Sequence, residues 1–258
     1  MCRLVAYAGP PLPLEPLVFH GEHSLFRQSW APQELLSGSV NVDGYGIAWS
    51  AGDGSQARIA RAEPIWYDED LRDLLRTVRS PVAQAALRNA TPGLPVDRSA
   101  VLPLVRENWA FTLNGAIPAF RERHMRALRG PLSDARYASL TGVGDAETLF
   151  LRVLQNMHQG HGPHEAMQDA VAAVEARLDD GEVAALTLIL SSERGVFVAH
   201  RSLGGGPCNS LYRASDPAWA PGGAVVASER LDETTEWIPV PPQSAWTLFP
   251  DGRSAQVG

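Results

Sequence analysis

Cys2 stands directly behind the initiator methionine, and the apolar run over residues 2–8 is typical of a short β-strand. If Met1 is removed, one residue carries both a thiol and a free α-amine, whose pKa is about 7.7–8.0. Such an amine can take the thiol proton near neutral pH and leave a nucleophilic thiolate. The position therefore predicts an N-terminal cysteine nucleophile. The alternative is that Cys2 is a small buried apolar residue.

Asn114 and Gly115 follow a second apolar segment, 108–113. A nucleophile that attacks an amide needs hydrogen-bond donors for the oxyanion that forms. Asn114 offers a side-chain N–H, and Gly115 allows a close backbone approach for a second donor. We expect an oxyanion hole here. The alternative is that the Asn-Gly pair makes a hairpin turn.

Two further pairs carry charges that suit a substrate. Arg88 and Thr91 follow the strand-like segment 82–87, and the guanidinium fork of an arginine suits a carboxylate. Asp145 and Glu147 open a helical segment, where a carboxylate suits a substrate ammonium. The alternatives are a surface arginine at Arg88 and a structural helix N-cap at Asp145.

The order of these motifs resembles the class II glutamine amidotransferases, which are N-terminal nucleophile hydrolases. The motifs are Cys2, Arg88-x-x-Thr91, Asn114-Gly115 and Asp145-x-Glu147. The resemblance implies an α+β fold, a four-layer αββα sandwich, with residues 2–258 as a single domain. It also implies that Cys2 is the nucleophile and that its own α-amine is the base.

The resemblance assigns the remaining roles residue by residue. Asn114 and the Gly115 amide would form the oxyanion hole, and Arg88, with Thr91 nearby, would hold the α-carboxylate of a glutamyl group. Asp145 would hold its α-ammonium. Many members have histidine where this chain has Leu113 and Pro92, which affects the details of glutamine positioning.

A narrower resemblance concerns the segments 23–32, 41–49 and 225–237. They resemble the ergothioneine-pathway branch of the family, whose members remove glutamate from γ-glutamyl-hercynylcysteine sulfoxide. The leaving group of that substrate carries a trimethylammonium, which aromatic faces bind well. The candidate aromatic residues are Trp30, Trp49, Trp66 and Trp109. Tryptophans of the core or its rim are the alternative.

The expected partner is therefore a small-molecule γ-glutamyl substrate. We expect no synthase domain after the last predicted strands, so hydrolysis of a γ-glutamyl amide is the favoured reaction. Two alternatives stay open: a glutaminase subunit that passes ammonia to a partner, and a non-catalytic scaffold. The oligomeric state also stays open.

The elements that position these residues follow from apolar periodicity. Strands are predicted at 2–8, 43–50, 57–62, 82–87, 108–113 and 184–191, with more in the last third. The segments 43–50 and 57–62 should pair as a hairpin. Helices are predicted at 68–79, 119–128, 145–157 and 163–178. Strands, then paired helices, then strands indicate helices layered on sheets.

Composition narrows the function classes. The 258 residues carry a net charge of −7, which argues against a nucleic-acid partner. No apolar run reaches about 18 residues, so we expect no membrane span. The chain has two cysteines and no apparent secretory signal, which favours a reducing cytoplasm. Cys208 is expected to be a bystander.

We expect no cofactor and no metal. His158, His161 and His164 lie three residues apart, but glycines and a proline separate them. This composition favours a polar loop between two helices over a zinc site.

Overall fold

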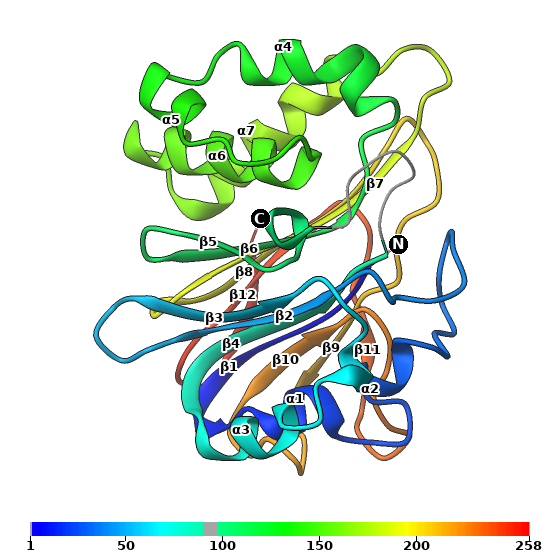
Figure 1. Cartoon of the computed structure of the whole chain (residues 1–258), viewed down its shortest axis with the longest axis vertical. Coiled ribbons are helices and arrows are strands. Elements are labelled where there is room, and N and C mark those ends of the chain that lie inside the picture. Colours follow the sequence, from blue (N-terminus) through cyan, green and yellow to red (C-terminus); the bar gives the residue numbers. More distant parts are fainter. Residues whose placement is uncertain (1, 90–96, 258) are drawn as a thin grey trace.

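Two antiparallel β-sheets pack face to face, and helices cover the outer face of each sheet (Figure 1). The computed structural model describes residues 2–89 and 97–257 of the chain. The resulting order of layers is helices, sheet, sheet, helices. This is the four-layer α+β sandwich that the sequence predicts.

The first sheet has seven strands in the order β11-β9-β10-β1-β4-β2-β3. Their bounds are β1 Arg3–Pro13, β2 Tyr45–Ser50, β3 Gln56–Arg61, β4 Arg79–Leu87, β9 Tyr212–Ser215, β10 Ala224–Ala227 and β11 Ile238–Pro239. The strand that follows Cys2 is therefore central, because β4 and β10 pair with its two edges. The predicted hairpin of β2 and β3 is confirmed, with Tyr45 opposite Arg61.

The second sheet has six strands in the order β13-β12-β8-β7-β6-β5. Their bounds are β5 Leu104–Arg106, β6 Trp109–Gly115, β7 Ala184–Ser192, β8 Gly195–Leu203, β12 Ser244–Leu248 and β13 Ser254–Val257. Because β6 runs through Asn114 to Gly115 and pairs there with β7, these residues do not form a hairpin turn. The alternative interpretation of the Asn-Gly pair is wrong.

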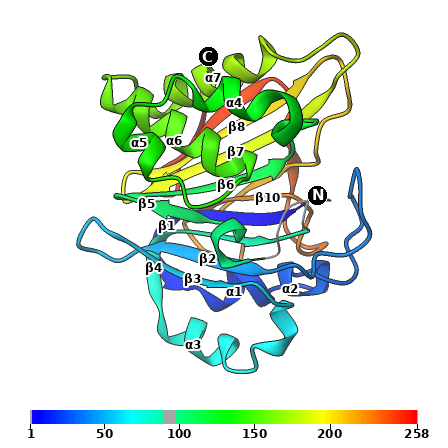
Figure 2. The ribbon, with the colours of Figure 1, turned by 45° about the horizontal axis from the view of Figure 1, so that its top comes forward.

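Figure 2 shows α4–α7 on the outer side of β6, β7 and β8, and α1–α3 below the first sheet. The helices are α1 Glu15–Phe19, α2 Leu25–Gln28, α3 Leu71–Thr77, α4 Met125–Arg129, α5 Asp134–Ala138, α6 Asp145–His158 and α7 Pro163–Glu175. Within residues 2–89 and 97–257, no helix is both long and apolar enough to span a lipid bilayer.

Three predicted helices are shorter than expected, and the one predicted at 163–178 ends at Glu175. The segment 119–128 begins as a π-helical turn over Phe120–His124, and it follows Ala119, whose backbone is left-handed with φ of 44°. Regular helix starts only at α4. The segment 68–79 is helical only in α3, since the Asp68 carboxylate accepts a hydrogen bond from the Tyr45 hydroxyl and lies before the helix.

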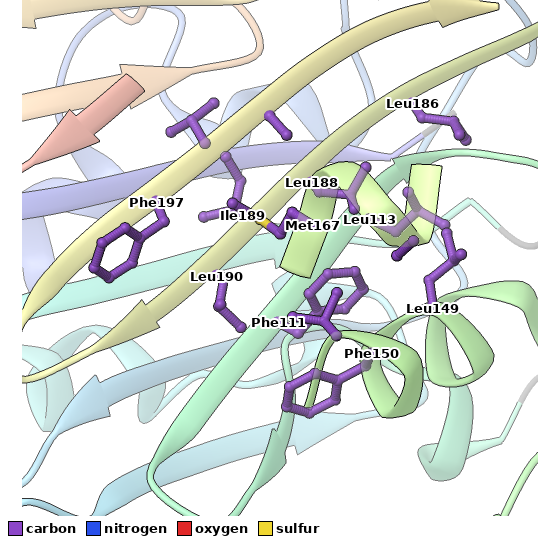
Figure 3. Close-up of a cluster of buried hydrophobic side chains, with 14 of the residues drawn as sticks. Phe111, Leu113, Leu149, Phe150, Met167, Leu186, Leu188, Ile189, Leu190 and Phe197 are labelled. Atoms are coloured by element: carbon purple, nitrogen blue, oxygen red, sulfur yellow. The ribbon is translucent and has the colours of Figure 1, made fainter. Parts of the chain in front are cut away.

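Alternating side chains of β1 divide the core into two clusters. Leu4 and Ala6 belong to the cluster that includes both sheets and α6, whereas Val5 and Tyr7 pack toward α1 and α3. On the other side of the second sheet, Phe111 of β6 stacks on Phe150 of α6 with ring centroids 5.1 Å apart (Figure 3). This contact fixes the helix whose first residue is Asp145.

We predict that Phe150→Ala lowers the free energy of unfolding by about 3–5 kcal/mol, because the truncation leaves a cavity beside the fully buried Phe111. Urea denaturation followed by circular dichroism measures the change. The control is Leu74→Ala on α3, whose side chain is 46% exposed and should cost less than about 1 kcal/mol. Equal losses in the two variants would contradict the packing argument.

Candidate active site

A cavity of about 310 Å³ brings together residues that are far apart in the sequence. Its lining includes Cys2 before β1, Arg88 after β4, Gly115 at the end of β6 and Asp145 at the start of α6. Both sheets and one helix therefore contribute to one site. The cavity wall thus combines a thiol, a cation, a glycine at the end of a strand and a carboxylate, four of the residues that the sequence singled out.

Cys2 lies on the inner face of the first sheet. Its side chain belongs to the same cluster as Leu4 and is 8% exposed, so it faces the second sheet rather than solvent. The Cys2 carbonyl accepts a 2.7 Å hydrogen bond from Nε of Arg3. Cys2 is therefore both buried, as the alternative interpretation required, and part of the cavity wall.

Asn114 and Gly115 end β6; Gly115 lines the cavity, whereas Asn114 is not among the residues that line it. The Asn114 side chain is fully buried, and neither Nδ2 nor Oδ1 has a hydrogen-bond partner among the described residues. Gly115 has φ of 140°, and a Cβ there would lie 1.9 Å from the Ala185 carbonyl oxygen. Only glycine fits, and a buried amide without partners is costly unless a ligand satisfies it. Both features suit an oxyanion hole.

Arg88 continues the pairing of β4 with the segment before β2. Its N–H donates to the Gly44 carbonyl at 2.7 Å, and its carbonyl accepts from the Asp43 N–H at 3.1 Å. The residue is 5% exposed, so the surface interpretation of this arginine is wrong. The backbone bonds hold a cation at the cavity wall.

Asp145 is the first residue of α6, and the N-cap is Gly144, so the N-cap interpretation of Asp145 is wrong. The chain already turns into the helix at Gly144, whose backbone is extended. Asp145 instead accepts hydrogen bonds from the N–H groups of Ile117 at 2.9 Å and Ala146 at 2.8 Å. Burial raises the pKa of Asp145, and these hydrogen bonds oppose that rise only in part. A bound ammonium would favour the ionised form.

Two positions of the predicted glutamine pattern, Thr91 and Pro92, lie outside the described residues. Leu113 lines the cavity and adds an apolar surface where many family members have histidine.

Glu147 also lines the cavity. Its carboxylate accepts hydrogen bonds from the N–H groups of Thr141 at 2.9 Å and Gly142 at 2.7 Å, and from Arg106 at 3.0 Å. Gly142 and Gly144 of this loop line the cavity. Glu147 therefore holds the loop that precedes Asp145.

A buried ion pair beside the nucleophile was not predicted from the sequence. Arg3 and Glu229 have exposed fractions of 0% and 1%, and Nη1 of Arg3 donates to Oε1 of Glu229 at 2.7 Å. Oε1 also accepts from the N–H of Glu34, and Oε2 accepts from His23 and from the N–H of Gln33. An arginine inside an apolar strand is the signal that could have revealed this pair.

The ionisation of Glu229 depends on these donors. Burial alone raises the pKa of Glu229, but the hydrogen bonds from His23 and Gln33 and the charge of Arg3 outweigh it and lower the pKa to about 2. The carboxylate is therefore ionised wherever the protein is near neutral pH. Segment 33–34 leads to Ser37 and Gly38, which line the cavity.

The three closely spaced histidines do not converge. His158 faces Glu107, His161 faces Asp169, and His164 bonds to Thr247. Within the described part of the chain, no group of three or more histidine, cysteine, aspartate or glutamate side chains could hold a metal ion.

The four candidate tryptophans lie elsewhere than expected. None of them lines the cavity among the described residues. Trp30 and Trp66 contact each other edge to face, and Trp109 packs on Phe197. Their positions do not support a shared site for the substrate cation.

Comparison with known proteins identifies the family. The model of the family described as "Glutamine amidotransferases class-II" matches residues 25–206, more than half of the chain. The chain belongs to the class-II glutamine amidotransferases. Three predictions are confirmed: the class II glutamine amidotransferase family, the αββα fold, and an enzyme that hydrolyses a γ-glutamyl amide.

Similar proteins of this family extend over almost the whole chain. "Gamma-glutamyl-hercynylcysteine sulfoxide hydrolase" of Mycolicibacterium smegmatis is 28% identical over 243 residues, which cover 93% of this chain and 92% of that protein. A solved glutamine aminotransferase class-II domain protein from Silicibacter pomeroyi superposes with a TM-score of 0.72 at 23% identity, covering 99% and 98% of the two chains.

A second solved structure shows the same fold within a longer chain. The glutamine phosphoribosylpyrophosphate amidotransferase of B. subtilis has a TM-score of 0.67 at 16% identity, and the match covers 99% of this chain and 49% of that one. Almost the whole of this chain therefore matches about half of that enzyme's chain.

We predict that Glu229→Gln lowers the free energy of unfolding at pH 7 by about 3–5 kcal/mol, because Arg3 then remains buried without a counter-charge. The folded pKa of Glu229 is depressed, so the wild-type advantage is present above the ordinary pKa of 4.5 and disappears between about 4.5 and about 2. Urea denaturation at several pH values measures it. Glu233→Gln, at an exposed glutamate nearby, should change little; an equal loss there would contradict the prediction.

Proposed function

We propose that this class-II glutamine amidotransferase hydrolyses a γ-glutamyl amide and that Cys2 is its nucleophile. The observation that carries the proposal is the convergence of Cys2, Arg88, Gly115 and Asp145 on one cavity between the sheets. A catalytic thiol, an oxyanion donor and two charges that match an amino acid are all present there.

The first half of the reaction forms a thioester. After removal of Met1, the α-amine of Cys2 takes the thiol proton, and the thiolate attacks the γ-carbonyl carbon. The carbonyl oxygen becomes an oxyanion, which Asn114 Nδ2 and the Gly115 N–H stabilise. Collapse breaks the carbon–nitrogen bond, and the α-ammonium returns its proton to the departing amine.

The second half restores the enzyme. The same α-amine removes a proton from water, and the hydroxide attacks the thioester through a second oxyanion. The carbon–sulfur bond breaks, glutamate leaves, and the proton on the α-amine returns to the thiolate. The α-amine relays one proton from the thiol to the departing amine and one from water to the thiolate, so the mechanism needs no further base.

The two charges at the cavity wall select the glutamyl group. Arg88 suits the α-carboxylate because a guanidinium donates two parallel hydrogen bonds. Asp145 suits the α-ammonium, whose arrival offsets the cost of a buried carboxylate. The bidentate geometry fixes the γ-carbonyl relative to Cys2, which is the positioning that amide attack requires.

We further propose γ-glutamyl-hercynylcysteine sulfoxide as the substrate. The support comes from the hydrolase of Mycolicibacterium smegmatis, which is similar over 93% of this chain. The cavity continues from the charged residues to an apolar wall of Leu102, Leu104 and Leu113. A bulky leaving group finds contact surface on such a wall, whereas ammonia does not use it.

We predict that the protein releases glutamate from γ-glutamyl-hercynylcysteine sulfoxide much faster than from glutamine, and that Cys2→Ala abolishes both activities to the background rate. Glutamate release is measured with each substrate separately, and the intact mass of the purified protein reports the removal of Met1. Cys208→Ala is the matched control and should keep full activity. An active Cys2→Ala variant would refute the mechanism, and rapid turnover of glutamine alone would refute the substrate.

We predict that Arg88→Ala lowers kcat/KM at least about 100-fold, because the substrate carboxylate loses a charge-assisted, bidentate partner. Steady-state kinetics of glutamate release measures the loss. Arg76→Ala on the exposed face of α3 serves as the control, since Arg76 pairs with Asp73 on its own helix and its side chain is 57% exposed. A kcat/KM within twofold of wild type for Arg88→Ala would remove this residue from the site.

A further inference from the structure

Asn209 lies in the loop between β8 and β9, and its side chain reaches the end of β6. The residue is 3% exposed, and its Nδ2 donates to the Asn114 carbonyl oxygen at 2.9 Å. The same nitrogen lies 3.4 Å from the Ala185 carbonyl oxygen of β7. One buried amide therefore joins β6 and β7 where the proposed oxyanion hole is built.

The hydrogen bond to the Asn114 carbonyl also determines where the Gly115 N–H points. The Asn114 carbonyl and the Gly115 N–H belong to one planar trans peptide, so they point in opposite directions. A donor that fixes the carbonyl also fixes the direction of the N–H. Gly115 lines the cavity together with Cys2, and its N–H is the proposed oxyanion donor.

The peptide needs such a restraint because of its glycine. Gly115 has φ of 140° and no side chain, so its backbone has more accessible orientations than any other residue type would have. The Ala185 oxygen packs against the Gly115 Cα and excludes a Cβ there. Asn209 donates to the carbonyl oxygens of both Asn114 and Ala185. These two hydrogen bonds restrain rotation of the peptide between Asn114 and Gly115.

We propose that Asn209 is a positioning residue that aims the Gly115 N–H at the oxyanion. The inference rests on the proposed function, because it presupposes attack by Cys2 on a carbonyl. The hydrogen bond to the Asn114 carbonyl also polarises the peptide and makes its N–H a stronger donor. Because an oxyanion exists only after attack, loss of Asn209 affects the chemical step rather than substrate binding.

The neighbouring residue provides a matched control. Cys208 Sγ lies 3.3 Å from Nε2 of His200, and His200 bonds to Thr187. Burial raises the pKa of the Cys208 thiol, which is therefore neutral near pH 7. Cys208→Ala changes the same loop and leaves the contact of Asn209 with Asn114 in place.

The test compares Asn209→Leu, Asn209→Asp and Cys208→Ala with the wild-type protein. For Asn209→Leu we expect kcat to fall about 30-fold or more with KM within about threefold. Alkylation of Cys2 by iodoacetamide, which needs no oxyanion hole and is followed by peptide mass spectrometry, should keep its rate within about twofold. Cys208→Ala should match wild type in all three measurements.

Asn209→Asp separates the donor from the shape of the side chain. An ionised aspartate has no proton to donate, whereas a protonated one donates through its hydroxyl. Relative to wild type, kcat of Asn209→Asp should therefore rise as the pH falls from 8 to 5.5. A merely structural role predicts no such pH signature.

The failure of this inference differs from the failure of the proposed function. A wild-type protein without Cys2-dependent hydrolysis refutes the function, and the crystal structure of Asn209→Leu then decides the inference by whether the 114–115 peptide plane has rotated. Unchanged kcat, or an unrotated peptide, overturns the role of Asn209. A fall of kcat together with slower Cys2 alkylation also overturns it, because the damage is then general.

Discussion

The proposed site depends on how firmly the first strand is held, because Cys2, once Met1 is removed, would have covalent support on one side only. β1 supports Cys2 because it lies at the centre of its sheet, where it pairs with β4 and β10. Ser228 forms three hydrogen bonds with Leu4: the Leu4 N–H donates to Ser228 Oγ at 2.9 Å, and the Ser228 N–H and hydroxyl donate to the Leu4 carbonyl at 2.9 and 3.3 Å. The proposed nucleophile therefore directly precedes a strand that is paired along both edges, opposite which the other sheet can present its groups.

The arrangement of the two sheets determines which groups meet Cys2. Alternation along β6 directs Phe111 and Leu113 toward α6, and it leaves Asn114 on the opposite face, toward β1. Gln84 of β4 donates to Ser191 of β7 at 2.7 Å and ties the two inner faces together. Stacking of Phe111 on Phe150 then sets the position of α6 and its first residue, Asp145. Apolar packing thus positions the polar site.

The sequence predicted the features that depend on neighbours along the chain. The β2–β3 hairpin and α6 follow from periodicity, whereas the grouping of Cys2, Arg88, Gly115 and Asp145 was expected only from the resemblance to the family. Contacts between residues far apart in the sequence could not be predicted, because they produce no local sequence pattern. Glu229 is 226 positions from Arg3, and Asn209 is 95 positions from Asn114. The N-cap assignment at Asp145 failed for a related reason, since the capping position depends on where the chain turns into the helix. The tryptophans could not be placed because composition does not specify which surface a ring packs on.

The Arg3–Glu229 pair connects the backbone of Cys2 to the segment that leads to the cavity wall. Each Glu229 oxygen accepts two hydrogen bonds, from Arg3 and Glu34 on one and from His23 and Gln33 on the other. Arg3 holds the Cys2 carbonyl, while Gln33 and Glu34 lead to the cavity wall at Ser37 and Gly38. One carboxylate therefore sets two parts of the site relative to each other. Since the pKa of Glu229 is about 2, the link keeps its charge throughout the pH range in which the α-amine of Cys2 would change protonation. The acid–base step can then proceed without loosening the support of the nucleophile.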